Sequence, residues 1–169
     1  MEEKQYDVQA VKSRLQDYVE TEREIDTHIE RLDYLEVRLV GVGAQNITDM
    51  PKAPSANLDR MGTMYAAKEE LETQVREMIE EQERFKKCVE AILRHLRRAD
   101  ERNVIRVHYF DRCDWNNVNF ILFGTKDDFV DKEETYLRRA HRVHGDALLH
   151  MAKYIEESND PNTAIFKEA

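Results

Sequence analysis

The chain of 169 residues is poor in residues that interrupt helices, with only five glycines and three prolines. Charged residues make up 36% of the chain and apolar ones 41%, a mixture typical of long amphipathic helices. The two cysteines, Cys88 and Cys113, do not form a Cys-x-x-Cys pair, and we expect free thiols rather than a disulfide. These scarcities predict an all-α fold.

Long apolar runs are also missing. No stretch of 18 apolar residues could cross a membrane, and the N-terminus lacks the basic and apolar regions of a signal peptide. We therefore expect a cytoplasmic protein without membrane contact.

Motifs for catalysis or cofactor binding are absent too. The chain has no Gly-rich phosphate loop and no Gly-x-Ser-x-Gly elbow. His141, His144 and His150 follow one another closely, but no cysteine lies near them, and His144 falls on an apolar stripe where a core imidazole is the usual reading. The acidic segment 127–134 lacks the glycine and glutamate spacing of a calcium loop. We expect no enzyme, no cofactor and no metal.

Charge is distributed unevenly around a net value of −9. Residues 1–83 contain 10 Lys and Arg against 20 Asp and Glu, whereas residues 84–112 contain 9 against 4. Within residues 135–154 there are four basic residues and one acidic residue. A basic surface formed by these last two segments would attract phosphates, although a charge run can also be simply a solvated helix face.

Two long helical segments show coiled-coil seams. The first has Val11, Tyr18, Ile25, Leu32 and Leu39 at one heptad position and Val8, Leu15 and Ile29 at the other. The second carries Leu71, Val75, Met78, Gln82, Phe85, Val89, Ile92 and Leu96, spaced alternately by four and three. We expect Gly41-Val-Gly43 to end the first helix, a loop at about 41–56, and a second helix beginning near Asn57 or Asp59.

These seams favour a long antiparallel, coiled-coil-like hairpin over residues 1–96, because tethered helices meet at high effective concentration. Pairing between two chains, giving a homodimer through the helical arm, is the alternative. Residues 156–169 read as a tail, although Ile165 and Phe166 could dock on the body.

The C-terminal part predicts a pair of shorter helices. Asp114 is a suitable N-cap for a helix that ends at Gly124, and Asp131 to Glu134 resembles a capping box that starts a second helix. That second helix has one buried stripe: Leu137, Ala140, His144, Ala147, Leu148 and Met151. The opposite face and its flank are basic, with Arg138, Arg139, Arg142 and Lys153. A buried stripe behind a basic face is what a helix in a DNA groove requires.

Residues 96–154 resemble the C-terminal part of the ArpU-type regulators of phages of Gram-positive bacteria, which are similar to region 4 of sigma factors. The matching residues are Tyr109-Phe-Asp111, Trp115-x-x-Val118, Leu122-Phe-Gly124, Asp127-Asp-Phe129, Tyr136-Leu-Arg138 and Val143-His-Gly145-x-Ala147-Leu148. The resemblance implies a small helix-turn-helix unit over residues 97–155. One feature departs from it: a turn of about three or four residues is usual, whereas residues 125–134 intervene here.

The resulting hypothesis is a DNA-binding transcriptional regulator of a phage or prophage that contacts a promoter or RNA polymerase. Its alternative is a structural or interaction protein that binds another protein through its helices without reading DNA. The predicted contacts to double-stranded DNA come from Tyr136, Arg138, Arg139, His141, Arg142 and Lys153.

Overall fold

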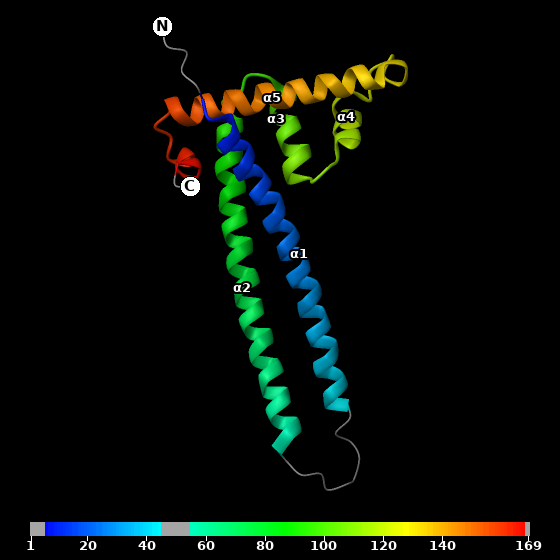
Figure 1. Cartoon of the computed structure of the whole chain (residues 1–169), viewed down its shortest axis with the longest axis vertical. Coiled ribbons are helices and arrows are strands. Elements are labelled where there is room, and N and C mark those ends of the chain that lie inside the picture. Colours follow the sequence, from blue (N-terminus) through cyan, green and yellow to red (C-terminus); the bar gives the residue numbers. More distant parts are fainter. Residues whose placement is uncertain (1–5, 45–54, 168–169) are drawn as a thin grey trace. The chain divides into compact units, whose positions relative to one another are not determined.

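The structure, a computed structural model, describes residues 6–44 and 55–167, which form helices and turns with no strand among them (Figure 1). The prediction of an all-α fold is therefore confirmed. The main helices are α1 (Val8–Ala44), α2 (Ser55–Leu93), α3 (Ala99–Ile105), α4 (Trp115–Phe123) and α5 (Glu133–Glu157). A π-helical turn (Arg106–Phe110) follows α3, and 3-10 turns occupy Val130–Lys132 and Pro161–Phe166. No helix in these ranges is long and apolar enough to cross a membrane.

Helices α1 and α2 pack against each other, as the seams predict, and both contribute to each of two compact units. The first unit, called here the C-terminal unit, joins the residues up to Glu20 with those from Glu83 onward. The second, the helical-pair unit, is Thr21–Gln82. Its small core consists of Ile25, Leu71 and Val75, flanked by Leu32, Leu35 and Met78.

The first seam is only partly as predicted. Leu15 is fully buried, but Ile29, which was expected at the same heptad position two repeats later, is 42% exposed. The prediction that Ile29 lies in the seam was therefore wrong, because a repeat within one helix does not determine which of its residues the partner helix covers. The other series holds, with Val11, Ile25 and Leu39 buried.

The first helix is longer than expected. Helix α1 runs to Ala44, one residue beyond the Gly41-Val-Gly43 segment where its end was expected. A glycine costs a helix about 1 kcal/mol relative to alanine but keeps its N–H, so it does not force an end. Helix α2 begins at Ser55, slightly before the expected start. Residues 45–54, the centre of the predicted loop, lie outside the described residues.

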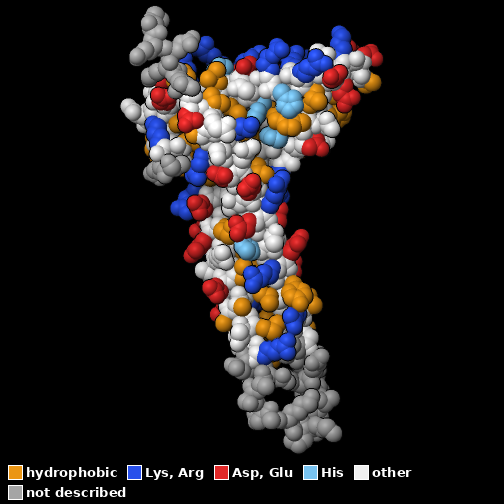
Figure 2. Space-filling view, viewed as in Figure 1, with side chains coloured by type: hydrophobic (Ala, Val, Ile, Leu, Met, Phe, Trp, Pro, Cys, Tyr) orange, Lys and Arg blue, Asp and Glu red, His pale blue; other side chains and the backbone are white. Residues whose placement is uncertain are grey.

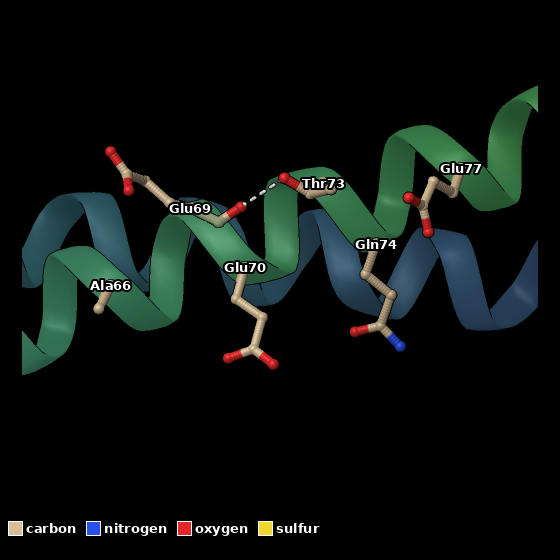
Figure 3. A pocket seen from close by; sticks show the side chains of 6 residues that line it. All are labelled: Ala66, Glu69, Glu70, Thr73, Gln74 and Glu77. Atoms are coloured by element: carbon tan, nitrogen blue, oxygen red, sulfur yellow. Dashed lines mark hydrogen bonds between the residues drawn. The ribbon is translucent and has the colours of Figure 1, made fainter.

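The outer face of α2 in the helical-pair unit is acidic and solvated. Figure 3 shows a hollow whose lining side chains all belong to this one helix: Ala66, Glu69, Glu70, Thr73, Gln74 and Glu77. The Thr73 hydroxyl donates to the carbonyl oxygen of Glu69 at 3.0 Å, an interaction within the helix itself. Three carboxylates on one helix surface fit a solvated face and are repulsive to nucleic acid.

The core of the C-terminal unit draws on every helix. Helices α3 and α4 both lie against α5 (Figure 1). The residues with no exposed surface in this core include Leu15, Val89, Ile92, Leu93, Val104, Ile105, Val118, Ala147 and Met151. Helix α5 therefore has a wholly buried stripe, and its opposite face is available to solvent.

The last residues complete this core. Phe166 is buried, with its ring centroid 5.7 Å from that of Phe85. The Arg14 guanidinium donates to the carbonyl oxygen of Ile165 at 3.1 Å. Of the two possibilities for Ile165 and Phe166, the docked one is therefore observed.

The chain bends between α2 and α3. Arg102 holds the bend by donating to the carbonyl oxygens of Leu96 at 2.6 Å and Arg97 at 3.2 Å. A bidentate pair between Arg106 and Glu90, with N–O distances of 2.9 and 2.7 Å, then ties the π-helical turn to α2. The hydrogen bond from Arg106 holds the pKa of Glu90 below its ordinary value. The bend orients α3 beneath α5.

Candidate nucleic-acid interface on helix α5

Helix α4 is defined at both ends by local chemistry. The Asp114 carboxylate accepts from the backbone N–H of Asn117 at 2.8 Å, which confirms the predicted N-cap. Gly124 follows the last residue of α4, and an added Cβ there would lie 2.5 Å from the carbonyl oxygen of Phe120. That close approach requires glycine.

The connection from α4 to α5 is packed rather than loose. The rings of Phe123 and Phe129 both stack on Tyr136, at centroid distances of 5.3 and 5.9 Å. The Tyr136 hydroxyl donates to Asp128 at 2.7 Å, and so does the Lys132 ammonium. These two hydrogen bonds hold the pKa of Asp128 below its ordinary value, the Lys132 bond being the larger cause. The lengthened connection therefore has a small apolar core of its own.

The start of α5 differs from the predicted capping box. A 3-10 turn (Val130–Lys132) leads directly into α5, and its N-cap residue, Lys132, makes no side-chain cap hydrogen bond. The capping-box prediction was therefore wrong, because the 3-10 turn leads into α5 without a side-chain cap. The Asn119 amide instead donates to the carbonyl oxygen of Glu133 at 3.1 Å, which links α4 to the first turn of α5.

The predicted DNA-contacting residues differ in availability. Tyr136 is half-buried in the cluster of the connection, and His141 packs on Trp115 with ring centroids 4.1 Å apart. Arg138 is 72% exposed but donates to Glu134 at 2.8 Å. Arg139 is exposed, with its guanidinium 5.0 Å from the centre of the Phe123 ring.

Two of the predicted DNA-contacting residues have charged side chains without a partner among the described residues. Arg142 and Lys153 are exposed and form no hydrogen bond or ion pair with any residue in the described ranges. Among the acidic residues on this side of α5, Asp146 lies 3.6 Å from the Arg98 guanidinium, and the last two residues of the helix are exposed glutamates. In Figure 2, Lys and Arg side chains gather along the edge of the C-terminal unit where α5 lies. The outward face of α5 thus has an excess of positive charge.

A cluster of histidine and aromatic side chains packs under the buried face of α5. Tyr109 and His144 share a hydrogen bond of 2.9 Å between the hydroxyl and Nε2, and His108 stacks on Trp115 at 4.3 Å. Burial lowers the pKa of His144 to about 4 and raises that of Tyr109 to about 12. Burial also lowers the pKa of His108. His144 is thus the core imidazole that the apolar stripe predicted.

Metal binding finds no support in this cluster. Among the described residues, no group of three or more His, Cys, Asp or Glu side chains is arranged to hold a metal ion. Instead, His108 Nδ1 lies 3.0 Å from the carbonyl oxygen of Cys113, and His144 is committed to Tyr109. Both imidazoles therefore serve in packing and hydrogen bonding.

An apolar patch near α4 was not anticipated as a surface. Phe120, Ile121 and Val130 are 64%, 54% and 86% exposed. The sequence of α4 is apolar on nearly every side, so periodicity alone could not separate its buried residues from these. The only signal was the excess of apolar residues over what one buried stripe needs.

Glu101 is the second missed feature. Its side chain is only 1% exposed although it lies in a strongly charged segment. Its carboxylate is held by His150 Nδ1 at 3.0 Å, a residue 49 positions away. No pattern in the sequence around Glu101 predicts a partner this far along the chain.

Comparisons with family models, with curated proteins and with solved structures found no match to this chain, so the similarity to the ArpU-type regulators stays a hypothesis based on the motifs themselves.

Proposed function

We propose that the protein binds double-stranded DNA through the outward face of α5 and acts as a transcriptional regulator of a phage or prophage. The observation that carries the proposal is the pair of exposed cations, Arg142 and Lys153, whose side chains form no hydrogen bond or ion pair with the described residues. Arg139 adds a third exposed cation. Phosphate contacts by such residues supply most non-specific affinity for DNA.

The buried stripe of α5 holds the helix in a fixed position for DNA binding. Since Ala140, Ala147 and Met151 have no exposed surface, the helix is anchored on one side and presents its cations as a rigid row. Arg139 and Arg142 lie about one turn apart, close enough to contact neighbouring phosphates or guanine edges in one groove.

The test compares DNA binding of the wild type with that of the double variant Arg139→Gln/Arg142→Gln. Fluorescence anisotropy on labelled duplexes across a salt series should show weaker binding and a smaller salt slope, because about two fewer counterions are released. The matched control is Arg60→Gln/Arg76→Gln, which removes two exposed charges from α2 in the helical-pair unit. A double α5 variant that binds DNA with the wild-type affinity and slope would refute the proposal.

A second candidate is protein binding through the patch of Phe120, Ile121 and Val130. All three side chains are more than half exposed, and exposed apolar surface is a common feature of protein interaction sites. The pairing of Arg138 with Glu134 also favours this candidate, since that arginine is partly neutralised. Purified bacterial RNA polymerase is the partner to test, with Phe120→Ser/Ile121→Ser as the variant. Binding that is lost in this variant while DNA binding persists would support protein contact.

A homodimer through the helical-pair unit remains part of the proposal. Val37 and Val40 on α1 and Tyr65 on α2 are half or more exposed. Sedimentation velocity decides the matter: a dimer that dissociates in the Val37→Lys/Val40→Lys variant supports it, and a monomer in the wild type refutes it.

A further inference from the structure

A cleft with several charged residues in its wall lies in the C-terminal unit, near the C-terminal end of α5. Its volume is about 580 Å³. The walls come from the connection between α2 and α3, from α3 itself, and from the last turns of α5. The lining residues are His95, Leu96, Arg97, Arg98, Glu101, His150, Lys153, Tyr154 and Glu157.

Three cations border this cleft with unused hydrogen-bond donors. Arg97 and Lys153 form no hydrogen bond or ion pair through their side chains with the described part of the chain. Arg98 lies 3.6 Å from both Glu101 and Asp146, beyond hydrogen-bonding distance, and is 58% exposed. Its guanidinium thus forms ion pairs with both carboxylates without a hydrogen bond to either, and its exposure allows it to turn toward an incoming anion.

A buried carboxylate forms part of the wall of this cationic cleft. The Glu101 side chain is 1% exposed, and its Oε1 has no hydrogen-bond partner among the described residues, although Arg98 Nη1 lies 3.6 Å from it in an ion pair. Its Oε2 is bonded to His150 Nδ1 at 3.0 Å. A buried carboxylate oxygen without a donor is costly, so a site that brings it a donor gains free energy.

The remaining wall is preorganised. The His95 ring stacks on Tyr154 at a centroid distance of 4.3 Å, and the Tyr154 hydroxyl donates to Asp160 at 3.1 Å. These contacts hold the floor of the cleft in place before any ligand enters, which lowers the entropic cost of binding.

We infer that this cleft binds a phosphate group that retains a proton, either inorganic phosphate or the terminal phosphate of a small monoester. The three cations neutralise the anion, and its P–OH group donates to Glu101 Oε1 once Arg98 turns toward the ligand. Sulfate and a DNA phosphodiester have no such proton and would place an oxygen lone pair against the carboxylate. This cleft shares Lys153 with the proposed DNA-binding face, whereas Arg97 and Glu101, where the site is tested, lie outside α5.

The test is isothermal titration calorimetry of the full chain with inorganic phosphate, with a nucleoside monophosphate and with sulfate. We expect saturable binding of at least one phosphate ligand and much weaker binding of sulfate. Tighter binding of inorganic phosphate identifies the free ion as the ligand, and tighter binding of the monophosphate identifies an ester. Absence of binding by both, or equal binding of sulfate, overturns the inference.

Variants locate the binding within the cleft. Arg97→Gln should weaken phosphate binding by roughly tenfold or more, the loss expected for one charge-assisted hydrogen bond. Arg76→Gln, an equivalent change on α2 of the helical-pair unit, should leave it unchanged. Glu101→Gln should reduce the preference for phosphate over sulfate, provided that its circular dichroism matches the wild type. Equal losses in the Arg97 and Arg76 variants would mean non-specific attraction and would overturn the site.

Discussion

Replacing His144 by glutamine should make the protein less sensitive to acid. In the folded state His144 is buried against Tyr109, and burial lowers the pKa of His144 from 6.5 to about 4. A depressed pKa means that the folded state binds fewer protons than the unfolded state. The stability contributed by the neutral imidazole is therefore complete above pH 6.5 and is lost as the pH falls toward 4.

The magnitude follows from the two pKa values. A shift of about 2.5 units corresponds to about 3 kcal/mol over the whole range. Between pH 7 and pH 5 the linkage relation gives about 2 kcal/mol of this loss. Glutamine does not titrate, and its amide oxygen can still accept from the Tyr109 hydroxyl. The variant should start less stable at pH 7, because it loses ring packing, but should lose about 2 kcal/mol less on going to pH 5.

Urea unfolding at pH 7 and pH 5 measures this, with circular dichroism at 222 nm and the fluorescence of Trp115, the single tryptophan, as independent probes. Wild type and variant are compared at each pH, so that titrating carboxylates cancel. Tyr109→Phe is the control: it removes the hydroxyl that bonds to His144 but leaves the imidazole buried. Its stability should drop at both pH values, and its pH dependence should persist.

An equal loss of stability between pH 7 and pH 5 in the wild type and the His144→Gln variant would refute the reasoning. Such a result would mean that His144 is already protonated when folded, or that it titrates normally. His108 also has a lowered pKa, again through burial, so some pH dependence should remain in the variant. Only the difference between the two proteins tests the assignment.

Further stability changes follow from burial and close contacts. Leu15→Ala should lower the free energy of unfolding by about 2–5 kcal/mol because Leu15 is fully buried, whereas Ile29→Ala should change it by about 0.5 kcal/mol or less; a large effect of Ile29→Ala in urea titrations would contradict its exposure. Gly124→Ala should lower the melting temperature by several degrees, since its Cβ would lie 2.5 Å from the carbonyl oxygen of Phe120, and an unchanged melt would contradict that geometry. Phe166→Ala should destabilise by about 3–5 kcal/mol in the same urea titration, and a neutral result would mean that the C-terminal turn does not dock.

The parts of the fold that could be predicted depend on short spacings. The burial of Val75 and Leu71 in α2 follows from alternate steps of four and three. The cap at Asp114 follows from a carboxylate placed directly before the helix, within reach of the backbone N–H three residues later. In α5, the buried stripe through Ala140 and Ala147 follows from the same periodicity. Each of these signals lies within one or two helical turns, where backbone geometry alone places the side chains.

The sequence predicted the helix face on which the candidate DNA-binding residues lie, but not which of them are paired with other side chains. Periodicity places Arg138, Arg139 and Arg142 outside the buried stripe, and all three are exposed. It does not reveal that Arg138 is paired with Glu134 whereas Arg142 is uncommitted. An exposed side chain has several possible partners within reach, and only the folded structure shows which contact forms.

The sequence by itself determined the helical class, the paired seams of α1 and α2, the cap of α4 and the basic outward face of α5. Only the tertiary structure decided the exposure of Ile29, the docking of Phe166 and the burial of Glu101. Glu101 meets His150 across 49 positions, and Arg14 meets Ile165 across 151. The physical reason is range: helix periodicity and capping act over a few residues, whereas the burial of a charge or a ring depends on which distant segments the chain brings together.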